Sequence, residues 1–106
     1  MVRATYRIEE DTHTLSIVGH ANYDAYGKDI VCAGVSSLVQ ALIGWAEENY
    51  YRAKCVSVDT KGGEVMISCE GGEDVASVFS LVSIGLEQIA DAYPSHVQYE
   101  FIGTAD

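Results

Sequence analysis

GHANYDAYGKDIVCAGVS, residues 19–36, is the stretch around which the rest of this 106-residue chain is arranged. It joins a histidine at the end of a predicted strand to a cysteine at the start of a predicted helix, through a loop rich in Gly, Tyr, Asn and Asp. A thiol and an imidazole placed at element ends and bridged by a loop are the parts of a nucleophilic site. We therefore take Cys32 as the candidate nucleophile and His20 as the candidate base.

The position of Cys32 favours an activated thiol. Asp29 precedes a long apolar-periodic run and is a good N-cap residue, so Cys32 falls in the first helical turn. Backbone N–H groups in that turn have no partner inside the helix, and the helix dipole there favours a thiolate. We expect the N–H groups of Cys32 and Ala33 to receive the oxyanion of a tetrahedral intermediate.

Each of these residues also has a structural interpretation. A lone cysteine is usually a small buried hydrophobe, and a lone histidine is usually satisfied or solvated. The combination with a capping aspartate and a glycine-rich loop favours chemistry. Asp29 has a second possible duty, which is to orient His20, but the cap explains its position without further assumptions. Ser36 lies one turn after Cys32 and either shapes the pocket or bonds back to a helix carbonyl.

The loop of residues 21–28 is expected to move and to contact substrate. Tyr23 and Tyr26 combine an apolar ring with a polar tip, which suits them to hold a peptide side chain, and the alternative is that they lie against the sheet. Gly19 permits close approach of a substrate or of the helix start, and Gly27 belongs to the same candidate binding loop.

Hydrophobic periodicity predicts seven elements. The expected strands cover residues 2–9, 15–18, 54–59, 64–69 and 97–102, and the expected helices cover residues 30–50 or 51 and 73–93. We expect Glu10, Asp11, Thr12 and His13 to form a turn, with His13 and His96 solvated. The order ββαββαβ indicates one α+β (mixed α/β) domain over residues 1–106, with two helices packed on one five-stranded sheet.

Composition narrows the class of binding partner and the expected location of the protein. Sixteen acidic and six basic side chains give a formal charge of −10, which disfavours direct binding of nucleic acid and favours a basic partner. No apolar run approaches the length of a membrane span and the first residues lack a signal-peptide core, so we expect a cytoplasmic protein. Cys32, Cys55 and Cys69 match neither a disulfide framework nor a zinc site, so reduced thiols and no metal are expected, with Cys55 and Cys69 as packing residues.

GHA, an aromatic- and glycine-containing loop and then GKDIVCAGVS resemble the signature of the ribosomal-processing cysteine proteases, the Prp family. His20, Gly27, Asp29, Cys32 and Ser36 stand in the family's order and spacing, and the resemblance covers nearly the whole chain. It implies a catalytic dyad of Cys32 and His20 without a cofactor. It further implies an endopeptidase that removes the N-terminal extension of a large-subunit ribosomal protein, and a homodimer.

Two other classes stay open at this point. One is a noncatalytic ribosome-associated module in which Cys32 only packs, and such a cysteine would be inert to alkylation at neutral pH. The other is a thiol enzyme of different chemistry, such as a redox sensor or an acyl transferase. A resolving cysteine beside Cys32 would favour the redox version, and the sequence places none nearby.

Overall fold

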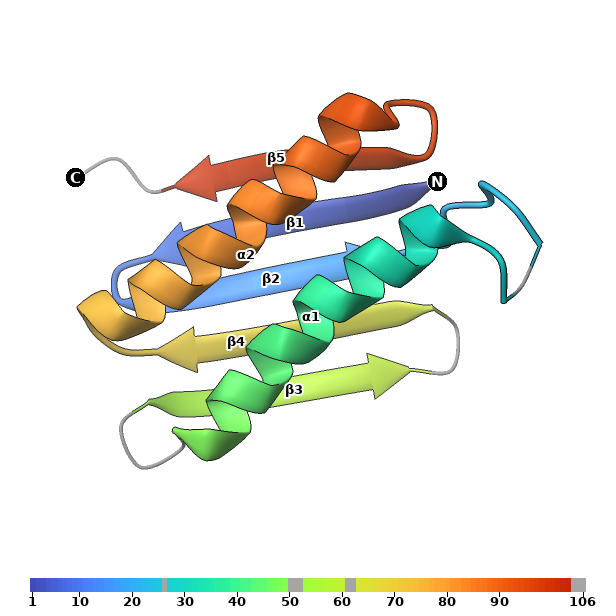
Figure 1. Ribbon diagram of the computed structural model, residues 1–106. Coiled ribbons are helices and arrows are strands. Elements are labelled where there is room, and N and C mark those ends of the chain that lie inside the picture. The colour runs from blue at the N-terminus through green and yellow to red at the C-terminus, as the bar shows by residue number, and fades with distance from the viewer. Residues whose placement is uncertain (26, 50–52, 61–62, 104–106) are drawn as a thin grey trace.

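The computed structural model describes residues 1–25, 27–49, 53–60 and 63–103, the side chains of residues 58–60 apart. Its elements are β1 (Val2–Glu9), β2 (Thr12–Val18), α1 (Ile30–Glu48), β3 (Lys54–Thr60), β4 (Glu64–Glu70), α2 (Glu73–Ala92) and β5 (Val97–Gly103). Figure 1 shows both helices lying across the same face of one sheet, which has five strands. The predicted α+β fold and its ββαββαβ order are confirmed.

The sheet brings three distant segments to one end of the molecule. Its strand order is β3-β4-β2-β1-β5, and all neighbouring pairs are antiparallel except β1 and β5, which are parallel. The helix α2 connects β4 to β5. Val18 at the end of β2 pairs with Arg3 of β1 and with Glu64 of β4. Consequently, Gly19 and His20 follow β2 beside both the start of β1 and Gly63, the residue before β4.

The core lies between the sheet and the two helices. Alternate side chains of β1, β2 and β4 point to the helices and are buried, including Ala4, Leu15 and Ile67, which are each 1% exposed. The helices contribute buried residues at helical spacing, namely Val31, Val35, Val39, Leu42 and Ala46 from α1 and Val75, Phe79, Val82 and Leu86 from α2. Each fully buried aliphatic or aromatic side chain contributes roughly 1.5–3 kcal/mol, so this layer supplies most of the stability.

His13 does not lie in a solvated turn, and that prediction was wrong. β2 begins at Thr12, the turn is made by Glu10 and Asp11, and Glu10 has a φ of 56°. His13 is only 5% exposed, and its Nδ1 is 2.6 Å from the hydroxyl oxygen of Tyr6. Burial lowers the pKa of His13 and raises the pKa of Tyr6 to about 12, so this pair is a neutral imidazole hydrogen-bonded to a protonated phenol.

Cys55 and Cys69 are joined by a disulfide, which overturns the prediction that all three cysteines are reduced packing thiols. The two residues face each other directly across β3 and β4. Cys69 is fully buried, and Cys55 packs partly exposed against the core. The sulfur-bearing face of β3 therefore points to α1, while Val56 on the other face is 66% exposed.

The helices differ from the prediction in small ways. α1 ends at Glu48 with Asn49 as its C-cap, and the expected extension to residues 50 and 51 falls outside the described residues. α2 ends at Ala92, before Pro94, close to the predicted stop. By length and composition alone both helices could cross a membrane, contrary to our sequence expectation. Each helix buries one face against the sheet.

Candidate active site

The backbone around His20 is held from two sides. Gly19 has a φ of 94°, and its N–H donates to the carbonyl oxygen of Gly63 at 2.9 Å. The Met1 nitrogen donates to the carbonyl oxygen of His20 at 2.6 Å. A side chain at Gly19 would collide with the carbonyl oxygen of Met1, so glycine is needed for this close approach of β1 and β2. The imidazole of His20 itself is exposed.

Asp29 ties the loop to the first turn of α1. One carboxylate oxygen, Oδ1, accepts the N–H of Cys32 at 2.9 Å, and Oδ2 accepts the N–H groups of Tyr23 at 2.9 Å and of Asp24 at 3.4 Å. The bond from Cys32 is the main cause that lowers the pKa of Asp29. Asp29 is therefore the N-cap that the sequence favoured, and both of its carboxylate oxygens accept backbone N–H groups.

Cys32 lies in the first turn of α1, partly buried against the core, and is the single free cysteine among the three in the chain. The predicted oxyanion donors are not available, however. The Cys32 N–H is occupied by the Asp29 carboxylate, and the Ala33 N–H donates to the Asp29 carbonyl at 3.0 Å. The same cap that fixes the helix start thus uses the donors that the sequence assigned to an oxyanion.

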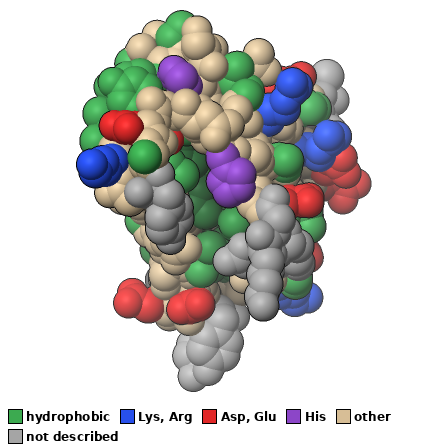
Figure 2. Space-filling model, turned by 90° about the vertical axis from the view of Figure 1, so that its right-hand side faces the viewer, with side chains coloured by type: hydrophobic (Ala, Val, Ile, Leu, Met, Phe, Trp, Pro, Cys, Tyr) green, Lys and Arg blue, Asp and Glu red, His purple; other side chains and the backbone are tan. Residues whose placement is uncertain are grey.

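Most of the predicted site residues line one open cavity. Its volume is about 490 Å³, and it is lined by His20, Asn22, Asp24, Gly27, Asp29, Cys32, Ala33 and Ser36. Figure 2 looks onto this end of the molecule and shows a hollow with hydrophobic atoms at its floor and a histidine at its rim. A volume of this size accepts a few side chains of an extended peptide. The thiol and the imidazole therefore face a shared space that is open to solvent.

Tyr23 is 42% exposed and packs against two other aromatic rings rather than against the sheet, which was the alternative to a substrate contact. Its ring meets the rings of Tyr93 and His96 edge-on, with centroids 5.3 Å apart in both cases. His96, which we expected to be solvated, is hydrogen-bonded through Nδ1 to the carbonyl oxygen of Ala21 at 2.9 Å. These contacts fasten the first half of the loop to the corner between α2 and β5. Tyr26, the other predicted substrate contact, lies outside the described residues.

Comparison with known proteins identifies the family. The model of the family "Cysteine protease Prp" matches residues 1–98. The chain belongs to this family.

Relatives of the Prp family agree over most of the chain. The "Ribosomal processing cysteine protease Prp" of Mycoplasma pneumoniae is 30% identical over 91 residues, covering 83% of this chain and 86% of that protein. The protein of the same name from Staphylococcus aureus is 30% identical over 89 residues, covering 78% and 80%. The Prp fold is likewise shared. The S. aureus protease in complex with a covalently linked product peptide superposes with a TM-score of 0.83 at 20% identity, covering 95% of this chain and 99% of that one.

Two cavity residues of this Prp-family chain were missed by sequence reasoning. Asn22 and Asp24 line the cavity, although only the tyrosines and glycines of the loop were singled out. Asn22 adopts a φ of 53°, a left-handed conformation that asparagine tolerates better than most residues. An Asn in a loop between two catalytic candidates is the only signal that the sequence offered. Gly19, in contrast, acts through the backbone beside His20 and is not among the residues that line the cavity.

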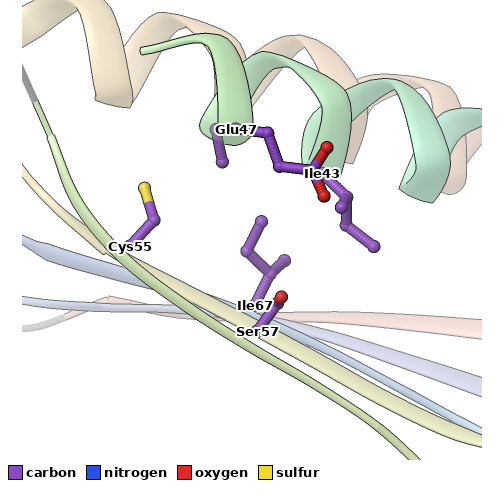
Figure 3. A pocket seen from close by; sticks show the side chains of 6 residues that line it. Ile43, Glu47, Cys55, Ser57 and Ile67 are labelled. Atoms are coloured by element: carbon purple, nitrogen blue, oxygen red, sulfur yellow. The ribbon is translucent and has the colours of Figure 1, made fainter. Parts of the chain in front are cut away.

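A second cavity lies toward the opposite end of α1. It has a volume of about 270 Å³ and is lined by Ile43, Ala46, Glu47, Cys55, Ser57 and Ile67. Figure 3 shows the side chains of Cys55 and Ile67 rising from the sheet toward the helix. Its sulfur belongs to a disulfide, so this cavity carries no free thiol. The Prp-family chemistry therefore has one candidate location on the described part of this chain, the cavity of Cys32 and His20.

Proposed function

We propose that this chain is an endopeptidase in which Cys32 and His20 form a catalytic dyad, and that its substrate is the N-terminal extension of a large-subunit ribosomal protein. The observation that carries the proposal is that the chain's single free thiol, in the first turn of a helix, shares an open cavity with His20. Family membership supports cysteine-protease chemistry. The relatives' names refer to ribosomal processing, and structures of the S. aureus protein contain a substrate peptide or a product peptide.

The reaction follows from the two groups. His20 takes the Cys32 proton, and the thiolate sulfur bonds to the scissile carbonyl carbon while the carbonyl electron pair moves to oxygen. When that intermediate collapses, the carbon–nitrogen bond breaks, and His20 gives its proton to the leaving amine. Water then attacks the thioester carbon and passes a proton to His20. The carbon–sulfur bond breaks, which releases the second product as a carboxylic acid, and His20 returns its proton to the Cys32 sulfur. These steps balance without a metal or a cofactor.

The oxyanion requires donors other than the N–H groups of Cys32 and Ala33, because Asp29 occupies both. The side-chain amide of Asn22 and the hydroxyl of Ser36 are uncharged donors on the cavity wall. We assign oxyanion stabilisation to these two groups. Removal of an oxyanion donor in a protease typically costs about 10²–10³ in kcat, which is large enough to measure in the Asn22→Ala and Ser36→Ala variants.

Charge supports a basic substrate. The chain carries a formal charge of −10, and Asp24 is an exposed acid on the cavity wall. A field of this sign attracts a basic peptide and repels phosphate backbones. We therefore propose a basic ribosomal protein as partner, no direct contact with nucleic acid or membrane, and a cytoplasmic location.

We also propose a homodimer. Leu81, Ile84 and Phe101 are 70%, 54% and 54% exposed, and Ile84 and Phe101 border one groove between α2 and β5. A second copy would remove this apolar surface from water. Light scattering on the wild type and on Ile84→Glu tests the idea, because a charge in that contact should give monomers. A wild type that scatters as a monomer would contradict the proposed dimer.

The deciding experiment is cleavage of the same organism's extended ribosomal protein, followed by mass spectrometry, with wild type, Cys32→Ala and His20→Ala in parallel. We expect one cleavage site, produced by the wild type alone. Cleavage by all three proteins would reveal a contaminating protease. If no protein cleaves and Cys32 does not react with iodoacetamide at neutral pH, the chain is a binding module and the proposal is wrong.

A further inference from the structure

We propose that Gly63, the last residue of the β3–β4 turn, is a positioning residue that sets where the His20 imidazole lies. This inference rests on the proposed role of His20 as the base of the reaction. Gly63 comes from a segment more than forty residues further along the chain and is not among the residues that line the cavity. Its effect on catalysis would act entirely through the histidine.

The contact between the two residues is direct. A Cβ atom built on Gly63 would lie 2.6 Å from Nε2 of His20, 3.0 Å from Cε1 and 3.3 Å from Cδ2. All three distances lie below ordinary carbon contact, which is about 3.5–4.0 Å. The imidazole therefore rests against the bare α-carbon of the turn, in space that any side chain at position 63 would fill. Gly63 also has a φ of +78°, in the region that favours glycine.

The backbone fixes this contact. The N–H of Gly19 donates to the carbonyl oxygen of Gly63 at 2.9 Å, which extends the β2–β4 ladder by one residue beyond Val18 and Glu64. On its other side, the His20 carbonyl oxygen accepts the Met1 nitrogen at 2.6 Å. The α-carbon of His20 is thus held relative to the turn. The remaining freedom of the imidazole is rotation about its two side-chain torsions, and Gly63 blocks one side of that rotation.

A methyl group at position 63 should displace the His20 imidazole and leave the surrounding backbone largely in place. The atoms it would meet belong to the far end of a side chain, which can rotate away, whereas the neighbouring backbone is paired in a sheet. Displacement of a catalytic group by about 1 Å can cost on the order of 10² in rate. We therefore expect Gly63→Ala to lower the reactivity of Cys32 by about tenfold or more while the protein stays folded.

The test is a double-mutant cycle that measures the alkylation rate of Cys32 by iodoacetamide. Because the other two cysteines are joined to each other, the unreduced protein offers one thiol to the reagent. Rates are measured across neutral pH for wild type, Gly63→Ala, His20→Ala and the double variant. In the His20→Ala background the ring is gone, so Gly63→Ala should change the rate by less than about twofold. The shape of the pH profile should likewise change only where the imidazole is present.

Backbone strain is controlled separately. Gly27 has a similar φ of +85° with no atom within 4 Å of a built Cβ, so the loss of thermal stability in Gly27→Ala reports strain alone. The histidine ring is followed by its NMR cross-peaks, which should shift in Gly63→Ala. An unchanged alkylation rate in Gly63→Ala would overturn the inference, as would an equal loss with and without His20. If His20→Ala itself leaves the alkylation rate unchanged, the proposed dyad fails and the role of Gly63 fails with it.

Discussion

A cavity lies at each end of α1 and each is lined by a cysteine, Cys32 of α1 at one end and Cys55 of β3 at the other, yet the two differ in chemistry. At the N-terminal end Cys32 has a free thiol in the first helical turn, beside polar side chains and an exposed imidazole. Toward the C-terminal end Cys55 faces a mostly apolar cavity and is bonded to Cys69 across two paired strands. The backbone decides the difference, because a strand pair places the sulfurs of Cys55 and Cys69 side by side. Cys32 lies instead in the first turn of a helix and has no cysteine partner, since the other two are bonded to each other.

The largest expected effect separates the two ends by reactivity. Alkylation of the unreduced protein should label Cys32 alone and lower cleavage by roughly 10⁶-fold, because the nucleophile is lost. Reduction followed by a second alkylation should add two labels, at Cys55 and Cys69. Peptide mass spectrometry at each stage locates the labels. Labelling of Cys55 before reduction would show that the sulfurs at the two ends of α1 are chemically alike.

The next effect concerns stability. The Cys55–Cys69 bond closes a loop of about fifteen residues, for which the chain-entropy account predicts that reduction costs about 3 kcal/mol of unfolding free energy. Urea denaturation with and without dithiothreitol measures this difference. Cleavage by the folded, reduced protein should stay within about twofold of the oxidised rate, since the bond lies far along α1 from Cys32. The Cys55→Ala/Cys69→Ala variant is the control and should not respond to dithiothreitol.

The stability of the reduced protein also tests the proposed cytoplasmic location. Disulfides are uncommon there, so the dithiol form is the one expected inside a cell if the proposed location is right. The stability of the reduced protein at growth temperature is then the relevant quantity. A reduced protein that unfolds below that temperature would contradict the proposed cytoplasmic location.

The smallest expected effect is on the acid sensitivity of protein stability, and it comes from Asp29 at the N-terminal end of α1. The pKa of Asp29 is lowered in the folded protein, chiefly by the Cys32 N–H, so the native state binds this proton less readily than the unfolded chain. The stabilisation is present above the unfolded value of 3.8 and is lost as pH falls through the lower folded value. The Asp29→Asn variant keeps an acceptor oxygen for the cap and should lose only this part of the acid dependence.

Thermal melts from neutral pH down to strong acid measure how much of the acid sensitivity comes from the Asp29 carboxylate. Asp29→Ala removes the cap as well and should melt a few degrees below Asp29→Asn at neutral pH. Equal melting temperatures for the two variants would show that the cap contributes little. An Asp29→Asn protein with the full acid dependence of the wild type would assign that dependence to other carboxylates.

Local patterns in the sequence were enough for the order of elements and for most of the cavity. Alternation in β1 and helical stripes in α1 and α2 are properties of neighbouring residues, and so is the capping position of Asp29. The prediction of a solvated His13 was wrong because a polar run after Glu10 resembles a turn. The burial of His13 depends on the hydroxyl of Tyr6 on the paired strand, which the local pattern does not contain. The Cys55–Cys69 bond depended on the register of β3 against β4, which cannot be read from either strand alone.

The remaining part of the site was unpredictable for a similar reason. Whether the N–H of Cys32 is free depends on the orientation of the Asp29 side chain, which three separate N–H groups determine. The contact of Gly63 with His20 depends on how a distant turn meets the end of β2. Sequence patterns identify the reacting groups, whereas the groups that orient them are brought together only by the fold.

The contact of Met1 with His20 has a practical consequence for protein production. Residues fused ahead of Met1 would leave the molecule beside the cavity, and the flexible peptide would be present there at millimolar effective concentration. An affinity tag in that place would compete with substrate as an intramolecular ligand. β5 runs parallel to β1, so β5 ends at Gly103 at the opposite end of the sheet from Met1, as Figure 1 shows. Recombinant protein for kinetic work should therefore carry its tag at the carboxyl terminus.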